Sequence, residues 1–242
     1  MANLVFLADA SWAWQLVTSG GIAGMALLGV LLLLSLAALS LTIEQLATLR
    51  LARLAPDGLA ARVRKLLQAG DLAGAKQACG DGGMLGVIAA SAIDEAQDLA
   101  AATEPAWPAI EKAMEDAAEV ESARLNRRVD YLALIGSLAP MIGLLGTVVG
   151  MIFAFREVAA TQGAATAGEL ASGIYQALVT TVGGLIVAIP SVAAYFLFRG
   201  RIEALSAEVA RQAADATRPL KQALSSGSTP RVQPPSPSGR VV

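Results

Sequence analysis

The chain has 242 residues, of which 55% are apolar and only 16% are charged, and its mean hydropathy is +0.57. A soluble globular domain carries about 25% charged residues, so the composition excludes an ordinary soluble domain. Its hydrophobicity also excludes a disordered chain. The net charge of −2, with no basic face in the sequence, predicts no nucleic-acid partner.

The charged residues are distributed unevenly along the chain. None occurs in Ala10–Ile43, Tyr131–Phe155 or Leu170–Phe198, and the remaining residues have the charge density of a soluble protein. About 20 apolar residues are enough for a helix to cross the hydrocarbon layer of a membrane. We therefore predict an all-α integral membrane protein with three transmembrane helices. Their expected ranges are 22–43, 131–155 and 170–198.

The first span reads as a retained helix and not as a cleaved signal peptide. A signal peptide has a basic start and an apolar core of about 7–15 residues, whereas no basic residue precedes Arg50 and the apolar stretch is longer. Residues 1–21 come before this span. Trp12 and Trp14 are typical of a membrane interface, and Ser11 can cap a short interfacial helix there.

Lysine and arginine near the span ends predict the orientation, because these residues are retained on the cytoplasmic side. The flanks that follow span one, precede span two and follow span three contain Arg50, Arg53, Arg62, Lys112, Arg124, Arg127, Arg128, Arg199, Arg201, Arg211 and Arg218. The opposite side has only Arg156, in the loop 156–169. We expect a multi-pass membrane protein with its N-terminus outside and its C-terminus in the cytoplasm. Its lipid headgroup anchors are then Arg124, Arg127, Arg128, Arg199 and Arg201.

The segment 44–130 is rich in strong helix formers and contains no alternation typical of strands. Turn signals containing Gly, Pro and Asp divide it into a cytoplasmic domain of four helices. The expected ranges are about 44–55, 59–79, 84–99 and 106–130. No stop signal separates the fourth helix from span two, so we predict one continuous helix from about Pro108 to Phe155.

The third span also continues beyond the membrane. Apolar residues recur there at spacings of three and four, which indicates an amphipathic cytoplasmic helix over 199–224 that packs against the long second helix. They are Ile202, Leu205, Val209, Ala213, Ala216, Leu220 and Leu224. Spans two and three therefore extend into the cytoplasmic helical domain. The Ser/Pro-rich tail 225–242 has the composition of a disordered segment.

The residue types exclude most intramembrane chemistry. The chain has no His, and no span contains Asp, Glu, Lys or Arg. An enzyme needs an acid, a base or a metal ligand, and a self-contained proton relay needs Asp, Glu or His. We therefore predict no enzyme activity, no metal and no cofactor. The lone Cys79 is expected to be a small buried hydrophobic residue.

Hydroxyls and one amide are the polar groups that remain in spans two and three. They belong to Ser137, Thr147, Ser172, Tyr175, Gln176, Thr180, Thr181 and Ser191. A threonine hydroxyl in a membrane helix commonly bonds a carbonyl one turn back, which is a structural role. The Gln176 amide needs partners, so it should face protein or water.

Small residues accompany this polar seam. Gly143, Gly146 and Gly150 form a ridge on span two, which is typical of close helix packing. On span three, one helix face carries Gly173, Gln176, Thr180 and Gly184. Pro140 and Pro190 are expected to bend their helices, leaving room for water or for a guest helix. The seam must be satisfied by copies of the chain or by a partner.

Two long motifs resemble the signatures of the MotA/TolQ/ExbB proton-channel family. The segment 138–155 (LAPMIGLLGTVVGMIFAF) is similar to the family's second-span signature, and 173–198 (GIYQALVTTVGGLIVAIPSVAAYFLF) to its third-span signature. The segment 42–50 (TIEQLATLR) resembles the exit of the first span in ExbB-like members. Three spans favour the ExbB/TolQ branch, because the MotA branch has four.

The resemblance implies a homopentamer in the bacterial inner membrane, with the N-terminus of each copy in the periplasm. Its central pore would hold ExbD/TolR-like single-span partners, each with a membrane Asp. Proton flow would move the partner, as in an ion-driven motor, and so drive periplasmic or outer-membrane work such as TonB-dependent transport. A TonB/TolA-like protein is a further implied partner. On this chain, Thr147 and Thr181 match pore-lining threonines, and Tyr195 matches an aromatic at the cytoplasmic mouth. Gln176 and Thr180 are expected to line the same proton pathway.

Gln176 departs from the family pattern, because many members have Glu at this position. An amide cannot titrate, so the partner's Asp would be the titrating group while Thr and Gln hold water beside it. The departure also keeps open a non-conducting membrane scaffold of the same fold. A solute carrier or a membrane enzyme is disfavoured, since the chain lacks internal repeats and charges in its spans.

Overall fold

The computed structural model describes residues 21–99, 106–162 and 166–225, and this part of the chain contains helices and no strands. Three of the helices are long and apolar enough to cross a membrane, within Gly24–Thr48, Trp107–Ala160 and Ala167–Leu224. The prediction of an all-α membrane protein with three spans is confirmed. The interfacial helix expected at Ser11, Trp12 and Trp14 and the tail after Ser225 lie outside the described residues.

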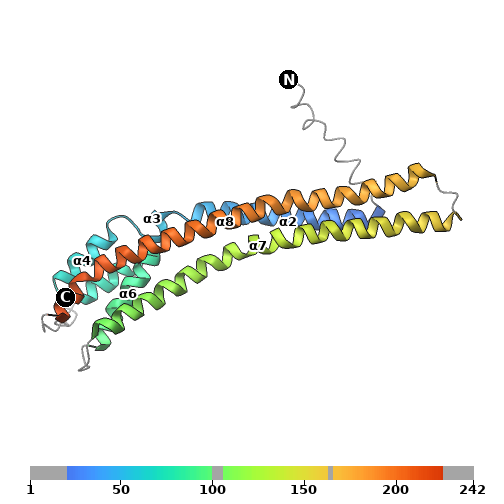
Figure 1. Cartoon of the computed structure of the whole chain (residues 1–242). Coiled ribbons are helices and arrows are strands. Elements are labelled where there is room, and N and C mark those ends of the chain that lie inside the picture. The colour runs from blue at the N-terminus through green and yellow to red at the C-terminus, as the bar shows by residue number, and fades with distance from the viewer. Residues whose placement is uncertain (1–20, 100–105, 163–165, 226–242) are drawn as a thin grey trace, which may run out of the picture. The chain divides into compact units, whose positions relative to one another are not determined.

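The helices differ greatly in length (Figure 1). Among the described residues, the chain begins with α2 (Gly21–Thr48) and ends with the two longest helices, α7 (Ala106–Ala160) and α8 (Ala167–Ser225). Four short helices come between them in the sequence: α3 (Leu51–Leu54), α4 (Leu59–Gln68), α5 (Leu72–Cys79) and α6 (Gly83–Leu99). The chain divides into two compact units. We call residues 1–44 with 128–197 the membrane unit, and residues 45–127 with 198–242 the core unit.

The continuous helix predicted from Pro108 to Phe155 is confirmed by α7, whose 55 residues correspond to about 82 Å at 1.5 Å per residue. The predicted continuation of span three is confirmed by the 59-residue helix α8. Pro140 and Pro190 both lie within helices that continue past them. Whether these prolines bend the helices stays a prediction.

Two of the predicted short helices are wrong. The helix expected over 44–55 does not exist as one element, because α2 continues to Thr48 and α3 begins only after Arg50, whose backbone is extended. The helix expected over 59–79 is two helices. Gly70 adopts a left-handed φ of 76° that ends α4. The Asp71 carboxylate then caps α5 by accepting a hydrogen bond of 2.8 Å from the Gly74 N–H.

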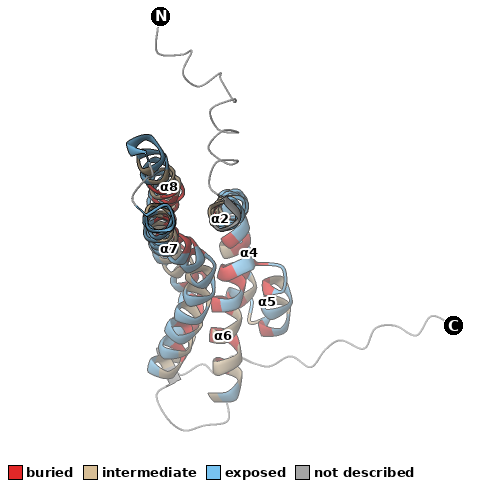
Figure 2. Ribbon diagram, turned by 90° about the vertical axis from the view of Figure 1, so that its right-hand side faces the viewer, coloured by how far each residue is buried: buried red, intermediate tan, exposed pale blue. Residues whose placement is uncertain are grey.

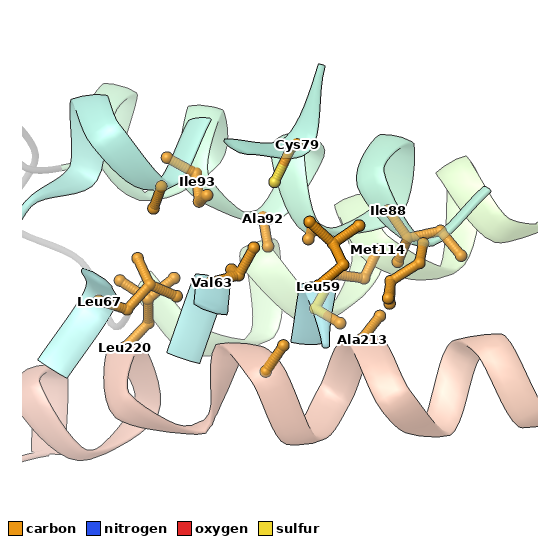
Figure 3. Packing of buried hydrophobic residues seen from close by; sticks show 14 of the residues in the cluster. Leu59, Val63, Leu67, Cys79, Ile88, Ala92, Ile93, Met114, Ala213 and Leu220 are labelled. Carbon is orange, nitrogen blue, oxygen red and sulfur yellow. The ribbon is translucent and has the colours of Figure 1, made fainter. Parts of the chain in front are cut away.

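The core unit is built around a hydrophobic cluster. Its residues come from the short helices, from the N-terminal part of α7 and from the C-terminal part of α8. Figure 3 shows Val63 and Leu67 of α4, Ile93 of α6 and Leu220 of α8 in this cluster. In Figure 2 the buried residues (red) are plainly visible on α4, α5 and α6. This cluster gives the core unit the packed interior that a soluble helical domain needs.

The amphipathic stripe predicted after span three is confirmed. Its residues Ile202, Val209, Ala213, Ala216 and Leu220 are buried, and Leu205 and Leu224 are partly buried against the same cluster. The packing of α8 on α7 in this unit is also confirmed, since the Thr217 hydroxyl lies 3.6 Å from the sulfur of Met114.

Cys79 lies in this core with 4% of its surface exposed, as the sequence predicted. Burial raises the pKa of the Cys79 thiol, and the negative charge of Asp94 adds to the rise. The thiol is therefore protonated at neutral pH, which makes it a poor nucleophile.

Candidate functional site

The polar seam of the membrane unit lies on α7 and α8, where these two helices pack directly against each other. The ridge glycines of α7 face small residues of α8. A Cβ added to Gly150 would come within 2.8 Å of the Ala177 Cβ, and one on Gly143 within 2.9 Å of the Thr180 carbonyl oxygen. These glycines are therefore needed for the close approach of the two backbones.

The same relationship holds from the side of α8. A Cβ on Gly173 would lie 2.7 Å from the Ala154 Cβ, and one on Gly184 would lie 2.5 Å from the Ala139 carbonyl oxygen. A further glycine that the sequence analysis did not single out, Gly136, has the same role against Val192. Small residues thus line the contact over a long stretch of both helices.

Two threonines of α8 donate to one carbonyl of α7. The hydroxyl of Thr181 donates to the Gly143 carbonyl oxygen at 3.0 Å, and that of Thr180 lies 3.3 Å from the same oxygen. The Thr180 hydroxyl also lies 2.7 Å from the Ala177 carbonyl of its own helix. Thr180 is only 5% exposed, so within one subunit it is part of the helix packing and is closed to solvent.

Thr147 and Thr181 are more accessible than Thr180. Both side chains are partly buried in the single chain. The Thr147 hydroxyl donates to the Leu144 carbonyl one turn back, at 2.6 Å, which is the common structural bond of a membrane threonine. Its oxygen keeps lone pairs that can accept a further hydrogen bond from water.

Gln176 lies at a junction of all three spans. Together with Thr180 of α8, it lines a small pocket whose other walls include Gly24 and Leu28 of α2 and Gly146 of α7. The pocket volume of about 30 Å³ has room for one or two water molecules. Gln176 is partly buried, so the expectation that its amide faces protein or water agrees with this placement.

The remaining predicted positions lie apart from this junction. The ring of Tyr195 makes an edge contact with Phe196 at a centroid distance of 5.1 Å. Tyr175 is 61% exposed, and the Ser137 hydroxyl bonds the Leu134 carbonyl of its own helix. The structure joins the hydroxyls of Thr180 and Thr181 at the Gly143 carbonyl, whereas the Thr147 hydroxyl bonds the Leu144 carbonyl.

Charged groups begin where the apolar stretches end. Arg128 of α7 forms an ion pair with Glu44 of α2, at 2.6 Å between the guanidinium and the carboxylate. Arg199 lies 3.6 Å from Glu203 and Arg124 lies 3.6 Å from Glu121. All these side chains except Glu121 are about half exposed or more. Among the described residues, no group of His, Cys, Asp and Glu could hold a metal ion.

The pattern of glycine ridge, threonine pair and uncharged spans agrees with comparison to known proteins. The MotA/TolQ/ExbB proton channel family matches residues 84–211, which is more than half of the chain. The chain belongs to this family. The match extends from α6 through the seam of α7 and α8 into the core unit, so it covers the candidate site.

Several curated relatives place this family member in the ExbB/TolQ branch. It is 45% identical over 83 residues to the biopolymer transport protein exbB1 of Vibrio cholerae, which is 33% of this chain and 36% of that protein. It is 42% identical over 96 residues to the Tol-Pal system protein TolQ of Pseudomonas aeruginosa, covering 40% and 41% of the two chains. It is also 39% identical over 90 residues to the biopolymer transport protein ExbB of Salmonella typhimurium, covering 37% and 36%.

The aligned segments thus span well under half of these relatives. Together with the family match, they support a role of this ExbB/TolQ-like chain in a proton-channel family associated with biopolymer transport. They also support assembly into a complex and a multi-pass membrane location. The family is one of channel and transport components, not of enzymes.

The site analysis from sequence missed one set of polar residues. Ser35 and Thr42 of α2 lie seven residues apart on one helix face, and both are partly buried. Their spacing was the available signal, since a seven-residue repeat keeps side chains on one side of a helix.

Proposed function

We propose that this protein is a proton-channel and stator subunit of the bacterial inner membrane, which couples the proton-motive force to movement of an ExbD/TolR-like partner. Movement of the partner would then drive periplasmic or outer-membrane work, such as TonB-dependent transport through a TonB/TolA-like protein. The observation that carries the proposal is the seam of hydroxyls on α7 and α8 within spans that contain no charged residue.

The proposed assembly is a homopentamer in which α7 and α8 surround the pore. Close α7–α8 packing leaves large apolar side chains on the outer surface of the pair, such as Met141, Leu145, Ile186 and Ile189, each at least 51% exposed. These residues can face lipid or neighbouring copies. Thr147, Thr181 and Gln176 then hold water along the pathway, and Thr180 maintains the packing beside them.

The titrating group comes from the partner in this proposal. A proton crossing 100 mV is worth about 2.3 kcal/mol, so a few protons in each cycle can repack a helix interface. Because Gln176 cannot ionise, the membrane Asp of a single-span partner supplies the proton-binding site. The N-terminus and the loop 156–169 are periplasmic, and the core unit with the tail 225–242 is cytoplasmic. Arg124, Arg127, Arg128, Arg199, Arg201 and Tyr195 lie at the cytoplasmic border.

Proton flux into liposomes tests the proposal. The full chain is reconstituted with and without an ExbD/TolR-like single-span partner, and flux should require both chains and the partner's Asp. The double variant Thr147→Val, Thr181→Val should reduce partner-dependent flux at least about ten-fold, because the polar lining is lost. Thr180→Val is the matched control, since it removes a hydroxyl from the helix packing. Unchanged flux in the double variant would refute the pore assignment.

The second candidate function is a non-conducting scaffold with the same fold, and Gln176 is the observation that favours it. Flux through the native chain, which has Gln at position 176, separates the two functions in the same vesicles. A scaffold would assemble with its partners and show no flux in the native form. A conducting subunit would show partner-dependent flux with Gln at position 176.

A further inference from the structure

One face of α2 alternates between apolar and polar residues as it passes through the membrane unit. Leu31 and Ala38 of this face are buried, and Ser35 and Thr42 lie between and beyond them, partly buried. A membrane helix that faced only lipid would have no reason to turn hydroxyls inward, because polar groups in hydrocarbon must find partners within the protein or in water.

These hydroxyls line a pocket between α2 and α8. The pocket has a volume of about 260 Å³, and its walls include Ser35 and Thr42 of α2 and Ile186, Pro190 and Ser191 of α8. It is much larger than the pocket beside Gln176 and shares no lining residue with it. The pocket is therefore a feature separate from the proposed pore lining.

Several polar groups of the pocket keep hydrogen-bonding capacity that the described residues do not use. Thr42 donates to the Ala38 carbonyl at 2.7 Å and Ser191 donates to the Val187 carbonyl at 2.7 Å, so both hydroxyl oxygens keep free lone pairs. Ser35 makes no hydrogen bond to any residue that the structure describes. Its O–H donor therefore lacks an acceptor in this part of the chain.

Pro190 leaves one carbonyl of α8, in a residue that lines the same pocket, without its usual helical donor. Within α8 the carbonyl of Ile186 would accept from the N–H of residue 190, but proline has no N–H. Ile186 and Pro190 both line the pocket. An unsatisfied backbone carbonyl in hydrocarbon costs free energy unless a donor reaches it.

Water is the ligand that meets these requirements. It donates to the Ile186 carbonyl and to the lone pairs of Thr42 and Ser191, and it accepts from Ser35. A site needs two to four polar partners for each water, and a water occupies about 30 Å³ in the liquid, so the pocket has room for several. A lipid acyl chain would fill the space and offer no hydrogen-bond partner to the Ser35 hydroxyl or the Ile186 carbonyl.

We propose that the pocket between α2 and α8 binds a cluster of ordered water inside the membrane. The water satisfies the carbonyl freed by Pro190 and joins the polar face of α2 to α8. Each subunit thus contains a hydrated site on the side of α8 that packs against α2, apart from the seam between α7 and α8. The site depends on the chain spanning a membrane and not on proton conduction.

Cysteine reactivity in liposomes tests the proposal with the full chain. A thiol reacts as thiolate, which forms in contact with water and not in hydrocarbon. In a Cys79→Ala background, Ser35→Cys places the thiol in the pocket. Leu36→Cys places it one residue further on a side chain that is 55% exposed on the outer surface of α2. A small methanethiosulfonate reagent should modify position 35 at least about ten-fold faster than position 36.

A second pair of cysteine variants, and a variant that fills the pocket, control for local misfolding. Thr42→Cys and Ile43→Cys repeat the comparison nearer the charged end of α2, where Ile43 is 59% exposed. Ala194→Leu, which adds bulk to another lining position, should slow modification at position 35 toward the rate at position 36. Equal rates at both members of each pair, or no effect of Ala194→Leu, would show that the pocket is dry or filled by another chain and would overturn the proposal.

Discussion

The side chain of Thr180 occupies the space into which a Cβ on Gly146 would project. A Cβ built at Gly146 would collide with the Thr180 hydroxyl oxygen and would lie 2.6 Å from its Cβ. Thr180 cannot rotate away without cost, because its hydroxyl bonds the Ala177 carbonyl and approaches the Gly143 carbonyl. Thr180, which the sequence suggested for the pore, thus packs against the glycine ridge of α7.

Gly146→Ala should therefore weaken the packing of α7 against α8. We expect a loss of about 1–3 kcal/mol in stability, as for other overpacked contacts, measured as a lower midpoint of thermal unfolding in detergent. Gly183→Ala is the matched control, since a Cβ there would meet Leu31 of α2 at an ordinary 3.6 Å. Equal stability of the two variants would contradict the close-packing interpretation.

The sequence was sufficient to predict the features that depend on periodicity and charge. The absence of charge from Tyr131 to Phe155 located span two. The spacing of Ile202, Val209 and Leu220 identified the face of α8 that is buried. The first feature follows from the length of apolar helix that crosses a membrane. The second follows from helix geometry, in which residues three and four apart share a face.

The sequence was not sufficient for features that depend on how two helices are rotated against each other. The sharing of the Gly143 carbonyl by Thr180 and Thr181 requires the register of α7 against α8. From sequence alone, a threonine hydroxyl can bond either a neighbouring helix or a carbonyl of its own helix. The second arrangement is the one found for Thr147. The break at Gly70 was visible as a turn signal, but helix-forming residues on both sides favoured the wrong continuous helix.

Ile93→Ala should destabilise the core unit. The Ile93 side chain is fully buried in the cluster of α6 with α4 and α8, and truncation of such a side chain costs about 2–5 kcal/mol. Val87→Ala, on the same helix but 45% exposed, should change stability by no more than about 0.5 kcal/mol. Hydrogen exchange of residues 59–99 measures the difference. Similar protection in both variants would exclude a single cooperative core.

Gln45→Met should stabilise the protein. Gln45 is fully buried, and neither of its amide atoms has a hydrogen-bond partner among the described residues. A buried amide without partners costs about 1–3 kcal/mol, and methionine has a similar shape without the polar atoms. Leu46→Met, at a position 56% exposed, is the control that should leave the unfolding midpoint unchanged. A lower midpoint for Gln45→Met would indicate that the native amide does have a ligand.

The first turn of α8 should loosen as the pH falls. The Glu169 carboxylate accepts hydrogen bonds from the N–H and the hydroxyl of Thr166, at 2.7 and 3.1 Å, and the Glu169 N–H lies 3.3 Å from that hydroxyl. This is a capping box. The backbone bond from Thr166, followed by its hydroxyl, holds the pKa of Glu169 below the ordinary value of 4.5.

Because the pKa is lower in the folded protein, the cap stabilises the helix above the ordinary carboxyl pKa and is lost as the pH falls through the folded value. Amide exchange at residues 167–170, corrected for the intrinsic effect of pH, should therefore show weaker protection in acid than at neutral pH. Glu169→Gln retains a hydrogen-bond acceptor that suits a capping box but has no titrating carboxyl, so its protection should not change over the same range. Parallel pH profiles for the native chain and this variant would show that the carboxylate does not stabilise the start of α8.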